Sequence, residues 1–155
     1  MPRKFLVVVD DSPEFEAALR FACRRAKSTG GRVVLLRVIP PGTDAHWSGA
    51  REEIERQQRE EAEALLNRVG EEATQRSGAA PVFLIEFGDA QGAIKKVVAA
   101  DPDIKILVLA AGNGARGPGP LVSAIVKHGA QLGGRKLPVT IVPGELTEDE
   151  IEDLA

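Results

Sequence analysis

Short apolar runs that alternate with longer helical patterns constrain the fold of this chain more than any other feature. The runs lie at 5–9, 33–38, 82–85, 106–110 and 139–142. Strands of a parallel sheet that is covered on both faces have such continuous apolar sequences, and a helix usually connects successive strands. The pattern therefore predicts an α/β fold, an open doubly wound parallel sheet of five strands with helices on both faces.

The segment between the first two runs carries clear signals for a helix over 13–29. Apolar residues recur there at intervals of three and four, Ser12 is placed to cap the helix N-terminus, and Gly30 is placed to cap its C-terminus. Cys23 lies on the apolar stripe, so we expect a buried and unreactive thiol. Because it is the only cysteine, an internal disulfide is excluded.

Three later segments are also predicted to be helical. The segment 49–77 is dense in Glu and Arg and has a core-facing stripe only in its second half. Asp89 is placed as the N-cap of another helix, which should end at Asp101 because a proline follows. A last crossover helix is expected over 121–132.

Charge and composition divide the chain into a domain of residues 1–144 and an acidic C-terminal tail of residues 145–155. The segment 104–144 contains five basic residues and no acid, whereas the tail contains six acids and no base. Thr147 and Glu150 have the spacing of a capping box, so the tail should form a short helix.

The net charge of −3 argues against nucleic acid as a partner. The first apolar run is too short for a membrane span or a leader, so we expect a cytoplasmic protein without membrane contact.

Two loops that follow strands are the candidates for chemistry, because ligands of open parallel sheets bind beyond the carboxyl ends of the strands. Asp10 follows the first strand, and the loop 111–120 follows the fourth. This loop matches G-x-G-x-x-G at Gly112, Gly114 and Gly117. A dinucleotide fingerprint would instead follow the first strand and open directly into a helix, so we reject that interpretation.

Two interpretations of the glycine-rich loop stay open. In one, its backbone N–H groups hold a phosphate, and Arg116 and Ser123 supply a charge and a hydroxyl group. In the other, it is an ordinary flexible surface loop. The chain has two histidines and one cysteine, and the sequence identifies no general base, nucleophile or metal set beside Asp10. We therefore predict that the protein is not an enzyme.

Several segments, taken together, resemble the universal stress protein family over nearly the whole chain. They are 6–14 (LVVVDDSPE), 35–40 (LLRVIP), 88–90 (GDA), 106–109 (ILVL) and 137–143 (LPVTIVP). Each is weak alone, but their order, spacing and total length make the resemblance fairly specific. It implies a sheet in the order 3-2-1-4-5. It also implies a homodimer in which the last strands of two subunits meet, here through Val139 and Ile141.

The resemblance also implies a nucleotide site. ATP-binding members hold adenine with an Asp after the first strand and a backbone group near the end of the second, which correspond to Asp10 and Val38. They hold the phosphates with a loop of Gly, two residues, Gly, nine residues, Gly and then Ser or Thr. Without gaps, the four positions fall on Ala110, Asn113, Ser123 and Ala124. This loop departs from the family pattern. Two expectations therefore stay open: that ATP is the ligand, or that the protein has no cofactor.

Three functional hypotheses follow. The leading one is a dimeric stress-response or signalling module that acts through an unidentified protein partner, without conventional catalysis and with a degenerate ligand site. The alternative is an ATP-binding member of the family with slow or no hydrolysis. A phosphoacceptor receiver domain is the third, but the rest of the metal and hydroxyl set that it needs is missing. If a ligand binds, the candidate residues are Asp10, Val38, Gly112, Gly114, Gly117 and Ser123.

Overall fold

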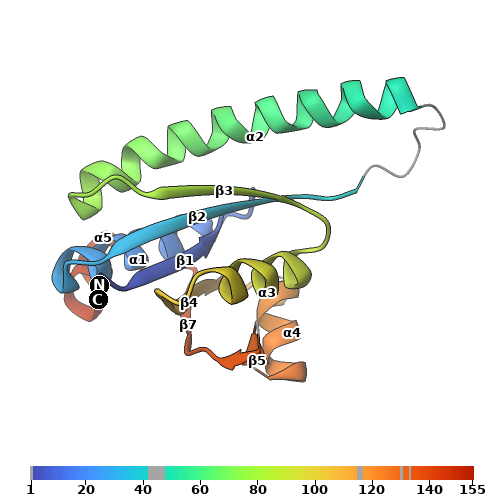
Figure 1. Ribbon diagram of the computed structural model, residues 1–155. Helices are drawn as coiled ribbons and strands as arrows, with labels where there is room; N and C mark the ends of the chain where they lie inside the picture. The colour runs from blue at the N-terminus through green and yellow to red at the C-terminus, as the bar shows by residue number, and fades with distance from the viewer. Residues whose placement is uncertain (1, 42–47, 115–116, 130, 133) are drawn as a thin grey trace.

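The sheet has the predicted architecture and strand order. The computed structural model describes residues 2–41, 48–114, 117–129, 131–132 and 134–155. Five parallel strands form the sheet: β1 (Lys4–Val8), β2 (Arg32–Ile39), β3 (Val82–Phe87), β4 (Ile104–Ala111) and β7 (Val139–Pro143). Their spatial order is β3-β2-β1-β4-β7 (Figure 1). Because β7 is the fifth strand of this sheet, the expected order 3-2-1-4-5 is confirmed.

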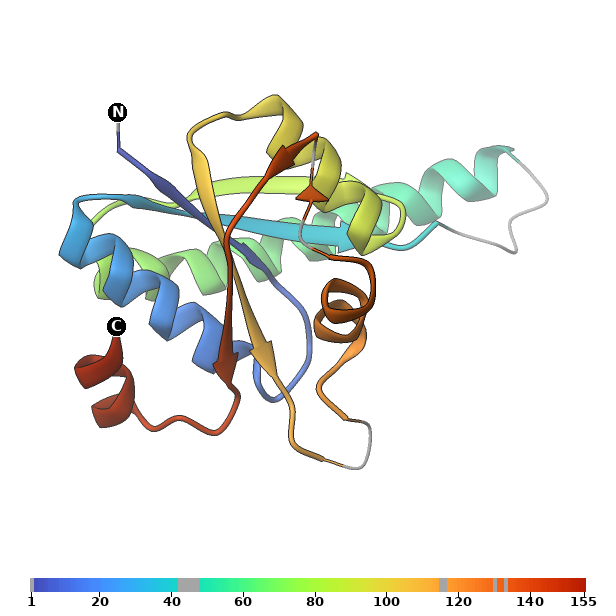
Figure 2. The ribbon, with the colours of Figure 1, turned by 90° about the horizontal axis from the view of Figure 1, so that it is seen from below.

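Helices cover both faces of the sheet, as predicted. They are α1 (Phe15–Thr29), α2 (Ser48–Ser77), α3 (Ala90–Ala100), α4 (Pro120–His128) and α5 (Glu148–Leu154). One apolar cluster joins α1, α2 and α5 to one face, and a second joins α3 and α4 to the other (Figures 1 and 2).

The central strands supply both clusters because successive side chains of a strand point to opposite faces. Phe5, Val7 and Val9 belong to the cluster under α1, whereas Leu6 and Val8 belong to the cluster under α3. This arrangement explains why the runs are continuously apolar instead of alternating.

Two helix ends that were predicted from sequence were placed wrongly. Helix α1 begins at Phe15 instead of residue 13, and the Ser12 hydroxyl group donates to Asp10 Oδ1 at 2.6 Å instead of capping the helix. Helix α4 ends at His128, four residues before the predicted end, because Gly129 has a φ of 86°. Gly30 caps α1 as expected, with a φ of 69° and its N–H donating to Ala26.

A short hairpin that sequence reasoning missed follows α4. Strands β5 (Gln131–Leu132) and β6 (Arg135–Lys136) pair in antiparallel fashion. The Arg135 guanidinium donates to the carbonyl groups of Val98, Asp101 and Ile104 at 2.7–2.9 Å. These bonds tie the hairpin to the end of α3 and the start of β4.

Helix α2 has the predicted two halves. Its second half places Ala62, Leu66 and Ala73 in the core. Its first half extends beyond the sheet (Figure 1), and Ile54 there is 43% exposed. In α3, the Asp89 side chain accepts from the Gly92 N–H at 2.9 Å, so the predicted N-cap is confirmed.

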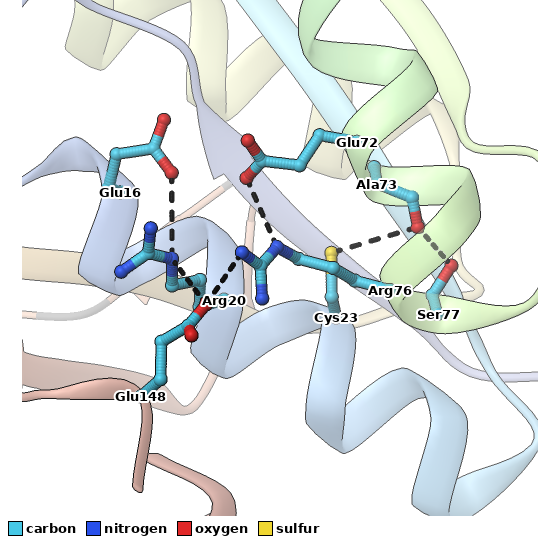
Figure 3. A network of polar contacts seen from close by, with 8 residues as sticks. All are labelled: Glu16, Arg20, Cys23, Glu72, Ala73, Arg76, Ser77 and Glu148. Atoms are coloured by element: carbon cyan, nitrogen blue, oxygen red, sulfur yellow. Dashed lines mark hydrogen bonds and ion pairs between the residues drawn. The ribbon is translucent and has the colours of Figure 1, made fainter. Parts of the chain in front are cut away.

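The acidic tail packs on α1 as α5, which Figure 2 shows beside it. The predicted capping box is present, since the Thr147 and Glu150 side chains each accept a backbone N–H of the other residue. Ile151 is 3% exposed, in the cluster under α1. Glu148 receives a hydrogen bond from Arg76 at 2.8 Å and lies 3.6 Å from Arg20 (Figure 3).

The thiol of Cys23 is buried between α1 and α2, as expected. It is 0% exposed, and its Sγ donates to the Ala73 carbonyl at 3.9 Å (Figure 3). Burial raises the pKa of the Cys23 thiol to about 12. At neutral pH the group therefore stays protonated and unreactive.

Candidate functional site at the strand ends

A cavity of about 360 Å³ opens at the carboxyl ends of β1, β2 and β4. Its floor is apolar and includes Val8, Val108 and Leu109. Its rim includes the N-terminal ends of α1, α3 and α4. Such a concave apolar site with a few convergent polar groups is typical of small-molecule binding, and its position matches the expectation for an open parallel sheet.

Asp10 lies on the cavity wall directly after β1. Its Oδ1 accepts two hydrogen bonds, from the Ser12 N–H at 2.9 Å and from the Ser12 hydroxyl group at 2.6 Å. This local turn fixes the carboxylate against the backbone. Among the described residues, Oδ2 has no recorded partner, so it can accept a hydrogen bond from a ligand.

Arg37 supplies the basic group of the described cavity wall. It projects from β2, donates to the Val9 carbonyl at 3.0 Å and lies 3.9 Å from Asp11 Oδ2. The guanidinium therefore links the end of β1 to β2. Val38, the next residue of β2, also lines the cavity. The structure thus brings Asp10 and Val38 together at one site, as the resemblance implied.

The glycine-rich loop folds back on itself. The Gly112 N–H donates to the Pro118 carbonyl at 3.1 Å, and the Gly117 N–H donates to the Gly114 carbonyl at 3.0 Å. In the described part of the loop, Pro118 and Gly119 line the cavity, while Gly112, Gly114 and Gly117 lie outside its walls.

Ser123, the last candidate of this region, also lies outside the cavity wall. Ser123 is exposed on the first turn of α4, and its N–H donates to Gly119 at 3.0 Å. Arg116 lies outside the described residues. The predicted site residues therefore separate into a pair at the cavity, Asp10 and Val38, and a loop group beside it.

Sequence reasoning missed three charged residues of the wall: Glu14, Arg37 and Asp89. Arg37 carried a signal, since it is the one charged residue within an otherwise apolar strand run. Asp89 was recognised only as a helix cap. The position of Glu14 depends on how the loops meet in space, which local sequence does not encode.

The described lining of the cavity combines several acidic groups with one basic group. Three carboxylates, of Asp10, Glu14 and Asp89, surround the cavity together with the Arg37 guanidinium. The described lining contains Ser12, whose hydroxyl group is a potential nucleophile, but no histidine that could activate it and no cysteine. Among the described residues, no group of three or more His, Cys, Asp or Glu residues is arranged to hold a metal ion. Within the same residues, no helix is both long enough and apolar enough to span a membrane.

Comparisons with known proteins agree with this architecture. The structure resembles universal stress protein UspA from Lactobacillus plantarum, with a TM-score of 0.71, 19% identity, and coverage of 90% of this chain and 97% of that one. It resembles a universal stress protein in complex with cAMP, with a TM-score of 0.64, 15% identity, and coverage of 93% and 98%. A third relative is a universal stress protein family protein from Arabidopsis thaliana with AMP bound, with a TM-score of 0.60, 21% identity, and coverage of 92% of both chains.

The comparison by sequence gives the family directly. No curated protein matches the chain. The model of the universal stress protein family matches residues 1–128. The chain therefore belongs to the universal stress protein family.

Proposed function

We propose that this protein is a non-catalytic stress-response signalling module that binds an adenine nucleotide in the strand-end cavity. The observation that carries this proposal is the convergence of Asp10 and Val38 on one cavity of about 360 Å³. That volume lies near the lower end of the range for small-molecule sites, about 300–1,000 Å³. It suits a planar base with a sugar better than a large ligand.

The wall chemistry suits adenine and ribose. Asp10 presents a fixed carboxylate oxygen that can accept from an amino or hydroxyl group, while apolar residues from β1 and β4 can pack on a flat ring. Relatives with this fold have cAMP or AMP bound. At 15% and 21% identity these relatives support the fold, so the proposal for the ligand depends on the cavity itself.

We infer that binding is the whole activity of this site. Hydrolysis needs an activated nucleophile and groups that stabilise a developing charge. The described lining offers carboxylates around one guanidinium that already bonds to the Val9 carbonyl. The occupied and empty states would then be read by an unidentified protein partner in the cytoplasm.

A homodimer across β7 is part of the proposal. Strand β7 lies at an edge of the sheet, and Ile141 on it is 39% exposed. Val139 on the same strand is half-buried. An edge strand with exposed apolar side chains is a typical surface for pairing with a second copy.

Calorimetric titration with AMP, cAMP and ATP, with and without Mg²⁺, tests the nucleotide site. We expect saturable micromolar binding of at least one ligand, and Asp10→Ala should weaken it at least tenfold, since it removes the fixed acceptor. Asp153→Ala is the matched control, because Asp153 is exposed on α5, away from the cavity. No binding by the wild type, together with no nucleotide carried through purification, would refute the proposed ligand class.

A further inference from the structure

The Glu14 side chain fills the space between the cavity and the glycine-rich loop. It lines the cavity, and it also lies against Gly112 and Gly119. A β-carbon at Gly112 would lie 3.3 Å from Glu14 Oε1, and a β-carbon at Gly119 would lie 3.8 Å from the same oxygen. The room that glycine leaves for the close approach of a ligand is therefore occupied here by a carboxylate of the protein.

Several backbone N–H groups in and beside the glycine-rich loop already donate hydrogen bonds within the protein. The Gly112 and Gly117 N–H groups donate to carbonyl groups within the loop, and the Gly144 N–H donates to Ala111 at 2.9 Å. The Asn113 side chain donates to Glu145, which fastens the loop to the segment after β7. A phosphate nest needs several backbone N–H groups that converge and are free. These donors are already satisfied within the protein.

The first turn of α4 is the remaining place for an anion at this end of the cavity. Its N-cap is Gly119 and its first residue is Pro120, which has no N–H to offer. The positive end of the helix dipole there favours a negative charge. Glu14 already places its carboxylate beside Gly119, so a phosphate would have to displace or approach an existing anion.

The charges of the cavity wall also oppose the binding of a phosphate. Asp10, Glu14 and Asp89 carry three negative charges, and the described cation, Arg37, already bonds to the Val9 carbonyl and lies near Asp11. Two like charges about 4 Å apart repel by about 1 kcal/mol in water and by more near a protein surface. Each phosphate charge that a ligand adds should therefore weaken its binding.

We propose that the strand-end cavity binds the uncharged nucleoside more tightly than its nucleotides, and that Glu14 is the residue that weakens the binding of phosphates. Adenosine then binds more tightly than AMP, and AMP binds more tightly than ATP. This inference rests on the proposed adenine site and reverses the preference that a phosphate-holding loop would produce. Asp10 and Val38 hold the base and sugar end, and Glu14 closes the other end.

The test is calorimetric titration of the full chain with adenosine, AMP and ATP, in EDTA and again with Mg²⁺. For the wild type we expect affinity to fall roughly tenfold from adenosine to ATP. In Glu14→Gln, which keeps the shape and removes the charge, ATP should bind about tenfold more tightly than it does to the wild type. Adenosine affinity should change less than threefold. Glu71→Gln, an exposed change on α2 with the same change in charge, should leave every affinity unchanged.

The possible outcomes separate this inference from the proposed function. If adenosine binds and ATP binds the wild type equally or more tightly, the role of Glu14 is refuted and the adenine site stands. If ATP binds best only with Mg²⁺ and Glu14→Gln weakens it, Glu14 acts through the cation, which also overturns the inference. If no adenine compound binds the wild type or Glu14→Gln, the adenine site itself is refuted. A circular dichroism spectrum equal to that of the wild type confirms that each variant is folded.

Discussion

Ile151 should provide most of the energy that docks the C-terminal helix α5 on the domain. It is 3% exposed in the cluster under α1, whereas Leu154 on the same helix is 62% exposed. Ile151→Ala removes three carbon atoms, at about 0.8 kcal/mol for each buried one, or about 2.4 kcal/mol in all. A residual cavity would add to this loss, but a helix at a chain end can relax around it, so we expect the lower end of the usual range of about 2–5 kcal/mol.

The ion pairs of α5 cannot replace this loss. Glu148 and Glu152 are 60% and 69% exposed where they meet Arg76, Arg20 and Arg24. Exposed pairs of this kind contribute about 0–1 kcal/mol each. The Ile151→Ala protein should therefore have α5 undocked in a large fraction of molecules while the sheet stays folded.

Urea denaturation and amide hydrogen exchange measure the two parts of this prediction. The free energy of unfolding should fall by about 2 kcal/mol in Ile151→Ala and by less than about 0.5 kcal/mol in the control Leu154→Ala. The Ile151 and Ala155 N–H groups, which close the turns of α5, should lose protection first. A loss below about 0.5 kcal/mol in Ile151→Ala, with protection unchanged, would refute the docking argument.

Two further predictions concern the tail and the sheet edge. The hydrogen bond from Arg76 lowers the pKa of Glu148 below its usual 4.5, so its contribution is present above that pH and lost as pH falls through the lowered value. The difference in urea midpoint between wild type and Glu148→Gln should thus be largest near neutral pH and shrink in acid; a constant difference would contradict this ion pair. Ile141→Asp should halve the mass measured by light scattering, because a charge would be buried at the proposed interface. Ile54→Asp, at a similarly exposed position on α2, should leave the mass unchanged, and an unchanged mass in Ile141→Asp would exclude the β7 interface.

The parts of the fold that were predictable are those set by local pattern. The five strands follow from apolar runs that must be covered on both faces. The Asp89 cap and the Thr147–Glu150 capping box follow from side chains that reach backbone groups three residues away. These features depend on neighbours in sequence, so one sequence is enough to locate them.

The errors arose where two local preferences compete, or where a contact with a distant part of the chain follows the helix end. Ser12 has the side chain of an N-cap, but in the structure it bonds to Asp10 and the helix begins three residues later. The pattern of α4 continues past His128, yet Gly129 ends the helix and a hairpin held by Arg135 follows. Neither competition can be decided from the spacing of residues along the chain.

The candidate site shows the same division, and it bears on how ligand choice can change in this fold. Asp10 and Val38 are placed by the ends of two adjacent sheet strands, so the sheet itself fixes the end of the cavity that we propose for the base and sugar. The other end depends on a loop with two prolines and on Glu14, which reaches it from the start of α1. Because loop residues and the Glu14 side chain form most of that end, we expect a substitution at Glu14 to change the preferred ligand charge while the sheet keeps its geometry. We therefore expect ligand selectivity and fold stability to be separable, and measuring both the ligand affinity and the free energy of unfolding of Glu14→Gln and Ile151→Ala tests this expectation.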